Sequence, residues 1–99
     1  MIRHIVMWKL KADNAEGKAA AIAEIASVLE PLANVIDGIS SLRVHANSEY
    51  ADVNWDAVLV GDYDSVAALD AYQVHPEHRA AAAIVRGHAA QRAAVDFEV

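Results

Sequence analysis

The chain has 99 residues, a formal net charge of -6 at pH 7 and no cysteine. Its 56% hydrophobic and 22% charged residues are typical of a single folded domain over residues 1–99, which excludes a disordered chain, while the missing cysteines exclude a disulfide framework and a Cys-based zinc site. Only eight Lys and Arg residues are present, and they are scattered, which argues against nucleic acid as a partner.

The first predicted element is a strand over residues 2–11, where side chains alternate between two faces. One face carries His4, Val6, Trp8 and Leu10, and the other carries Ile5, Met7 and Lys9. The strand begins without a charged leader or a long apolar stretch. We therefore expect no signal peptide, no membrane partner and a cytoplasmic location.

A helix is predicted next, with Asp13 or Asn14 as its N-cap. Its apolar residues recur at spacings of three and four, as on one buried face: Ile22, Ile25, Leu29, Leu32 and Ile36. Pro31 is expected to kink or split this helix, and Asp37-Gly38 is suited to end it with a left-handed cap.

The rest of the chain predicts a hairpin, two helical pieces and a last strand. The hairpin strands cover residues 39–46 and 55–63 and are joined by a polar loop. Ser65 or Asp64 can cap a helix to about residue 74, after which Pro76 interrupts it. A further helix is expected from Glu77 to about Arg92, before a strand over residues 95–99.

The predicted order βαββαβ is that of an α+β ferredoxin-like domain, with an antiparallel sheet and helices on one face. The other face is also apolar, because Ile5, Met7, Val58 and Val60 point to it. When both faces of a sheet are apolar, each face must pack against another layer, and a large exposed apolar patch is unusual on a monomer. We therefore expect a homodimer whose two sheets pack face to face.

Tyr72 and His78 are the candidate acid–base pair. His78 lies in the first turn of the helix opened by Pro76, where the helix dipole disfavours the imidazolium, so a mostly neutral ring is expected near pH 7. Such a ring can take a proton from a carbon between two carbonyl groups, and the Tyr72 phenol can donate to the forming oxyanion. In the plainer alternative, Tyr72 is a core-edge residue and His78 points to water.

His4 is expected on the helix side of the sheet, where it hydrogen-bonds a ligand carbonyl, orients His78 or is a hydrogen-bonded core histidine. The residues expected to line a pocket around these side chains are Val6, Trp8, Trp55, Ala57, Leu59, Ala81, Val85 and Ala89. Small residues opposite large aromatic ones either leave space for a hydrophobic ligand or interdigitate as core. The sequence leaves both open.

No metal and no other cofactor is expected. His75 and His78 are three residues apart, but His75 precedes a proline, and no HExxH motif or acidic cluster completes a metal site. The sequence also lacks a GxGxxG motif, a phosphate-binding loop and a nucleophile elbow, which argues against nucleotide cofactors and serine hydrolase chemistry.

Three segments together resemble the stress-responsive dimeric α/β barrel family, often abbreviated Dabb: the opening MIRHIVMWKLK, the middle AYQVHPEHRAAAAIVR and the ending VDFEV. The likeness covers nearly the whole chain and implies a dimeric α+β barrel. The plant polyketide cyclase of this family, which forms olivetolic acid, closes the ring of a linear poly-β-ketone without a cofactor. Its catalytic Tyr and His match Tyr72 and His78 here, and its strand-borne His matches His4, whereas another pocket His is replaced by Ala57.

Three functions remain open. The first is a cofactor-free cyclase or related enolisation enzyme that uses His78, Tyr72 and His4 on a polyketide-like ligand. The second is a cofactor-free monooxygenase of the related antibiotic-biosynthesis type. The third is a non-catalytic, stress-responsive binding protein, which alone survives if these three side chains diverge.

Overall fold

The computed structural model describes all 99 residues, Met1–Val99. Its elements, including one 3-10 helix η1, are β1 (Ile2–Leu10), α1 (Ala15–Leu29), η1 (Glu30–Asn34), β2 (Ile39–Ala46), β3 (Ala57–Tyr63), α2 (Val66–Val74), α3 (Pro76–His88) and β4 (Ala89–Glu98). The ferredoxin-like βαββαβ order is therefore confirmed, with the second helical segment in two pieces.

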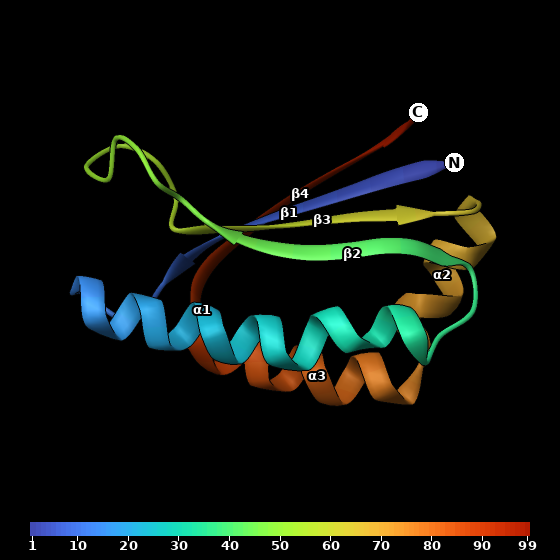
Figure 1. Cartoon of the computed structure of the whole chain (residues 1–99), viewed down its shortest axis with the longest axis horizontal. Helices are drawn as coiled ribbons and strands as arrows, with labels where there is room; N and C mark the ends of the chain where they lie inside the picture. Colours follow the sequence, from blue (N-terminus) through green and yellow to red (C-terminus); the bar gives the residue numbers. More distant parts are fainter.

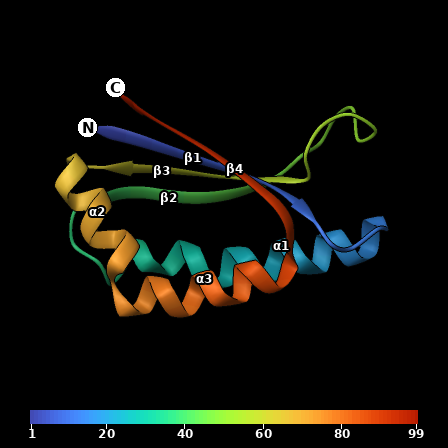
Figure 2. The ribbon, with the colours of Figure 1, turned by 180° about the vertical axis from the view of Figure 1, so that it is seen from behind.

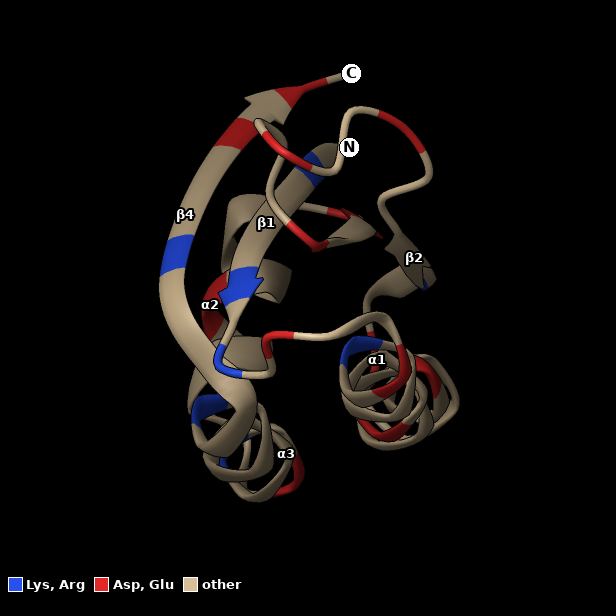
Figure 3. Ribbon diagram, turned by 90° about the vertical axis from the view of Figure 1, so that its left-hand side faces the viewer, with Lys and Arg blue, Asp and Glu red and all other residues tan.

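The four strands form one antiparallel sheet in the order β2-β3-β1-β4, so the first and last strands of the chain are neighbours. Figure 1 shows α1 and α3 running together along one face, and Figure 2 shows the same two layers from behind, with α2 at one end. In the end-on view of Figure 3 both long helices lie on one side of the sheet. The sheet thus has an inner face under helices and an outer face that no helix covers.

The inner face and the helices form the core. Val6 and Trp8 are 2% and 3% exposed, whereas their neighbour Met7 on the outer face is 41% exposed. On α1 the buried residues Ala21, Ile25 and Leu29 recur every four positions, so one side of the helix rests on the sheet. Each fully buried aliphatic side chain contributes about 1.5–3 kcal/mol relative to an exposed one.

The outer face is apolar along its middle, as the alternation in the sequence predicts. Ile5 pairs with Val60 on one side and with Val95 on the other, and all three point away from the helices. Val95 and Phe97 are 57% and 42% exposed. An apolar surface that crosses three strands is therefore open on a single copy of the chain.

The first helical segment begins, breaks and ends at the residues that the sequence predicts. Asn14 is the N-cap of α1 and accepts from the Gly17 N–H at 2.7 Å. Pro31 stands in η1, so the helix is split there, and Gly38 has the left-handed φ of 87° expected after Asp37. None of the helices combines the length and the apolar character needed to cross a membrane.

The last helix and the last strand differ from the prediction. The helix ends at His88, not near Arg92, and β4 begins at Ala89, not at Val95. β4 pairs with β1 over nearly the full length of both strands. The ladder hydrogen bonds therefore outweigh the helix propensity of the alanine-rich segment, which is a weak preference for each residue.

The hairpin strand β3 begins at Ala57, not at Trp55, because Asp56 is held in a bend. Its carboxylate accepts from the Leu10 N–H at 2.8 Å and pairs with Lys18 Nζ at 3.0 Å. Burial acts to raise the pKa of Asp56, but the hydrogen bonds from Leu10 and Lys18 outweigh it and hold this pKa below its ordinary value.

Candidate functional site

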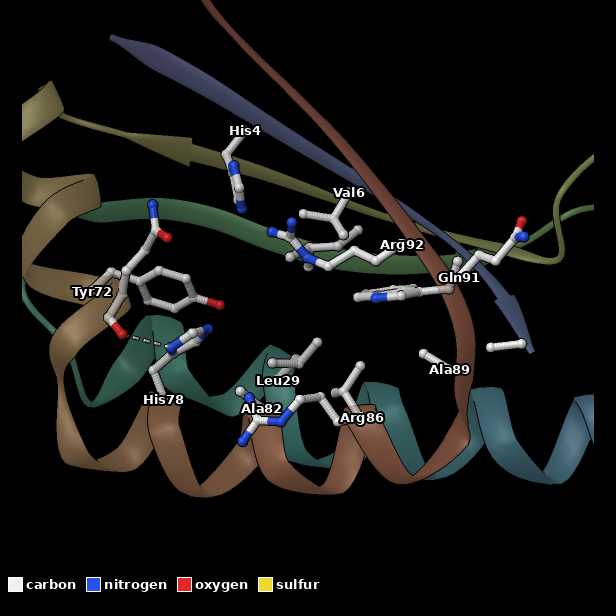
Figure 4. A pocket seen from close by; sticks show the side chains of 15 residues that line it. His4, Val6, Leu29, Tyr72, His78, Ala82, Arg86, Ala89, Gln91 and Arg92 are labelled. Atoms are coloured by element: carbon white, nitrogen blue, oxygen red, sulfur yellow. Dashed lines mark hydrogen bonds between the residues drawn. The ribbon is translucent and has the colours of Figure 1, made fainter. Parts of the chain in front are cut away.

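A cavity of about 630 Å³ opens between the inner face of the sheet and the helices α2 and α3. This volume lies in the range of small-molecule sites. Figure 4 shows side chains from β1, α2, α3 and β4 pointing into it. The predicted residues that line it are His4, Val6, Trp8, Leu59, Tyr72, His78, Val85 and Ala89. The structure thus brings the three candidate acid–base residues to one cavity, with Ala89 reaching it from β4 and not from the predicted helix.

Three residues that the sequence placed in the lining lie elsewhere. Ala57 and Ala81 are buried in the core, 4% and 5% exposed. Trp55 lies on the other side of the sheet, in a shallow hollow with Met7, where the Lys9 ammonium is 5.7 Å from its ring centroid. The alternation of β3 does not reach Trp55, because this residue precedes the strand.

Tyr72 and His78 come from consecutive helices that meet at a proline. His75, between them, has an extended backbone with φ -64° and ψ 135°, because a residue before proline is disfavoured in the helical region. The chain therefore changes direction at Pro76. The rings of Tyr72 and His78 lie with centroids 4.3 Å apart at an interplanar angle of 48°, and Figure 4 shows both at one end of the cavity.

A backbone carbonyl fixes the imidazole of His78. Its Nδ1 lies 3.1 Å from the Gln73 carbonyl oxygen, and because a carbonyl only accepts, Nδ1 donates and the lone pair of the neutral ring is on Nε2. Burial is the largest influence on the pKa of His78 and lowers it, Gln73 opposes this, and the nearby groups His4, Arg92 and Arg86 lower it further. The direction of this shift agrees with the predicted neutral ring, and burial is the largest of its causes.

The hydroxyl of Tyr72 has no hydrogen-bond partner within the chain, although the residue is 1% exposed. The same holds for Tyr63, whose ring centroid lies 5.0 Å from that of Tyr72. Burial raises the pKa of Tyr72 to about 12 against an opposing interaction with the adjacent Tyr63 hydroxyl, and burial together with the Tyr72 neighbour raises the pKa of Tyr63 above its ordinary value. Both phenols are therefore neutral donors near pH 7, and each unpaired buried hydroxyl costs about 1–3 kcal/mol.

Gly61 makes room for this tyrosine pair. A Cβ atom at Gly61 would lie 2.8 Å from Tyr63 Cε1 and 2.9 Å from Leu42 Cδ1. Gly61 pairs with His4 across the sheet, and the rings of His4 and Tyr63 meet edge to face with centroids 6.0 Å apart. The missing side chain thus allows a row of four rings to run from β1 to α3.

His4 is the buried polar residue of β1, 4% exposed, and its Nδ1 pairs with the carboxylate of Asp96 on the neighbouring strand β4. Because the carboxylate occupies Nδ1, the other ring nitrogen, Nε2, is directed into the cavity, as Figure 4 shows. One nitrogen satisfies the prediction of a hydrogen-bonded core histidine, and the other is available to a ligand.

Sequence reasoning assigned no role to Asp96, Arg86 or Arg92. Asp96 and His4 are 92 positions apart, and only the pairing of β4 with β1 brings them together. The only sequence signal for this contact was the aspartate of the ending VDFEV, and nothing in the sequence indicated which residue it would pair with. Arg92 had been placed at the end of a helix, whereas its position on β4 turns it into the cavity with Arg86 of α3.

The two histidines on either side of Pro76 form hydrogen bonds with different backbone groups. His75 Nδ1 accepts from the Glu77 N–H at 3.1 Å and so caps α3, whereas His78 Nδ1 is bound to the Gln73 carbonyl. No group of three or more His, Asp or Glu side chains is arranged to hold a metal ion.

The arrangement suits proton transfer on a carbonyl compound. His78 presents an unprotonated nitrogen, Tyr72 presents a hydroxyl donor beside it, and His4 presents a second imidazole from the opposite wall. A base and a hydrogen-bond donor in one cavity are the requirements for forming and stabilising an enolate.

Known proteins that resemble this chain have the same fold. The model of the stress responsive A/B barrel domain matches residues 2–99, and none of the curated proteins compared with the chain matches it. A dimeric ferredoxin-like protein of unknown function from Bacteroides fragilis is 30% identical, with a TM-score of 0.87 over 99% of this chain and 95% of its own. One from Thermobifida fusca is 30% identical, with a TM-score of 0.78 over 99% and 90%. The hydroxynitrile lyase of Passiflora edulis shares the fold at 14% identity, with a TM-score of 0.76 over 99% and 92%.

Proposed function

The chain belongs to the stress-responsive A/B barrel family, and on that premise we propose that it is a cofactor-free acid–base catalyst of the cyclase type, acting on a polyketide-like carbonyl compound. The observation that carries this proposal is the unpartnered hydroxyl of Tyr72 beside the imidazole of His78. A buried donor that the chain leaves unpaired is satisfied when a ligand oxygen accepts from it.

A residue of the cavity can carry out each proton transfer or hydrogen bond that the proposed reaction needs. His78 Nε2 removes a proton from a carbon next to a carbonyl group, and the Tyr72 hydroxyl donates a hydrogen bond to the oxygen on which negative charge develops. The enolate carbon attacks a second carbonyl of the same molecule, which forms the ring bond and leaves an alkoxide. The His78 imidazolium returns its proton to that alkoxide, so protons and electrons balance without a cofactor.

The other lining residues position the ligand. His4 Nε2 faces the cavity and is held in orientation by Asp96. Because Nδ1 donates to the carboxylate, Nε2 carries the lone pair of the neutral ring, so it can accept from an enol hydroxyl of the ligand opposite the reacting carbonyl. Val6, Trp8 and Leu59 form an apolar wall on one side of the cavity. A wall of low polarity strengthens a hydrogen bond from Tyr72 that lies against it.

We further infer that the working unit is a homodimer joined through the outer face of the sheet. Ile5, Val60, Val95 and Phe97 lie on this face, and the last two are more than 40% exposed on a single copy. The similar structures from Bacteroides fragilis and Thermobifida fusca are described as dimeric. The cavity lies on the inner face, so this packing leaves it open.

Deuterium exchange tests the proposed chemistry without knowledge of the natural product. The protein is incubated in D2O with aryl ketones and β-keto esters, and loss of the proton signal next to the carbonyl is followed by NMR. The wild-type chain is expected to accelerate exchange over buffer. His78→Ala should abolish the acceleration, and Tyr72→Phe should reduce it by roughly a hundredfold or more, the usual worth of a general base or an oxyanion donor.

A matched control removes another imidazole. His45 lies on β2 and is exposed, so His45→Ala should exchange at the wild-type rate. If all three variants exchange alike, the acid–base assignment is wrong. Ligand binding without exchange would instead indicate the non-catalytic binding protein, and consumption of oxygen by the same ketones would indicate the monooxygenase.

A further inference from the structure

Two arginines line the cavity from opposite walls, Arg86 from α3 and Arg92 from β4. Figure 4 shows both side chains extending along the cavity toward the end where His4, Tyr72 and His78 lie. Neither guanidinium forms an ion pair, since the four salt bridges of the structure join other residues. Two cations thus border the same cavity without an acidic partner.

The charge of this cavity is opposite to the charge of the chain. Asp and Glu outnumber Lys and Arg by 14 to 8, yet no acidic residue is among the 15 that line the cavity. In Figure 3 basic residues mark α3 and the middle of β4, the two elements that border the opening, whereas acidic residues gather on α1, the loops and the far end of β4. The cavity is therefore a local positive site on a negative molecule.

We propose that the ligand of this cavity is a keto acid, whose carboxylate is bound by Arg86 and Arg92 while its carbonyl group reaches Tyr72. This proposal rests on the proposed function, because it names the substrate class of the same site. A guanidinium presents parallel N–H donors that match the two oxygens of a carboxylate, and two such groups can share one anion. Water satisfies both exposed guanidinium groups until the carboxylate replaces it.

The apolar part of the lining defines the body of this ligand. Trp8, Leu29 and Val85 line the cavity together with the arginines. Apolar walls beside two guanidinium groups and a hydroxyl donor fit a molecule with an apolar body whose carboxylate and carbonyl groups are a short distance apart. A neutral hydrocarbon would leave the cationic end without a function, and a small inorganic anion would leave the apolar walls unused.

Binding of benzoylbutyrate tests the proposal, because this molecule joins an aryl ketone to a carboxylate through a short apolar chain. Its methyl ester keeps the shape and removes the charge, and its phosphonate analogue distinguishes a carboxylate site from a phosphate site. Trp8, which lines the cavity, reports binding by fluorescence in a Trp55→Phe background. The acid is expected to bind about tenfold more tightly than the ester, the effect of roughly 1.4 kcal/mol.

Arginine variants assign the difference to the proposed residues. Arg92→Gln and Arg86→Gln should each remove most of the preference for the acid, without changing the affinity for the ester. Arg79→Gln is the matched control, because it removes the same charge from α3 at a residue that does not line the cavity. It should behave like the wild type. The preference should also weaken as salt is raised from about 50 to 300 mM, because screening shortens the reach of the charges.

The outcomes separate this proposal from the proposed function. Equal binding of acid and ester overturns the carboxylate site, and if Tyr72→Phe still weakens the ester, the proposed function stands. A preference for the acid that the arginine variants remove, together with wild-type deuterium exchange in Tyr72→Phe, supports the carboxylate site and contradicts the catalytic assignment. Tighter binding of the phosphonate than of the acid, or binding of neither acid nor ester, overturns the keto acid.

Discussion

The imidazole of His78 lies against the phenol of Tyr72, with ring centroids 4.3 Å apart, although a proline separates their helices. Two backbone features produce this contact. Pro76 turns the chain between α2 and α3, and the Gln73 carbonyl holds His78 by Nδ1. The proposed base and the proposed donor are thus oriented by the fold before any ligand binds, which is the property that preorganised sites require.

Tyr72→Phe should leave the folded state as stable as the wild type, or stabilise it by up to about 1 kcal/mol, because the hydroxyl it removes is buried without a partner. Tyr72→Ala should instead lower the free energy of unfolding by about 3–5 kcal/mol, since it deletes a ring at 1% exposure. Urea unfolding measures both. A loss of more than about 1 kcal/mol in the phenylalanine variant would show that the hydroxyl has a partner in the folded protein.

The lowered pKa of His78 predicts a specific pH dependence. Burial makes the folded state release the His78 proton more readily than the unfolded state, whose pKa is about 6.5. Between the two values the unfolded state binds more protons, so stability rises with pH. The contribution is complete above about pH 6.5 and is lost as the pH falls through that value toward the folded pKa.

His78→Gln should therefore flatten the stability profile below about pH 6.5. NMR titration of the His78 ring should place its midpoint below that value in the folded wild type. The exchange activity should follow the same midpoint and stay level through pH 7. A midpoint above 6.5 would contradict the neutral base and with it the direction of proton transfer.

Gly61→Ala should destabilise the protein by about 1–3 kcal/mol, because the new methyl group would meet Tyr63 and Leu42 at less than 3.0 Å. Tyr63 would be displaced toward Tyr72, so ligand binding should weaken as well. Gly87→Ala is the matched control, since nothing lies within 4 Å of its added Cβ and alanine favours the helix. The control should be neutral or slightly stabilising, and equal losses in both variants would contradict the close packing at Gly61.

The elements that local patterns determine could be read from the sequence. The alternation of residues 2–11 placed His4, Val6 and Trp8 on the inner face, and Pro76 and Gly38 marked real breaks in the chain. The fold class followed from these elements, because few topologies accommodate βαββαβ with one covered face.

Features that depend on pairing between residues far apart in the chain could not be predicted from the sequence. The helix was extended to Arg92 because alanine-rich residues favour helix locally, and only the ladder with β1 makes residues 89–98 a strand. The same error concealed Arg92 as a lining residue. The partner of His4 is Asp96, 92 positions away, and no local pattern connects them. Trp55 was misplaced for a related reason, since the bend at Asp56 is set by contacts with β1 and α1.

Val60→Lys should separate the proposed dimer. Val60 lies in the middle of the outer face, where it pairs with Ile5 on β1 and Arg43 on β2. A stable interface of ordinary size buries about 800 Å² of each partner, and an unpaired ammonium at its centre costs several kcal/mol, which raises the dissociation constant by roughly a hundredfold or more. Light scattering at micromolar concentration should give twice the chain mass of 10.6 kDa for the wild type and the chain mass itself for the variant.

Val35→Lys is the control for this substitution, because Val35 is 57% exposed and follows η1, away from the outer face. It introduces the same charge and should leave the dimer intact. If the wild type has the mass of one chain, or if both lysine variants dissociate equally, the outer face is not the interface. Since the cavity opens on the other side of the sheet, Val60→Lys should keep the affinity for benzoylbutyrate, and a parallel loss of binding would mean that the partner subunit shapes the cavity.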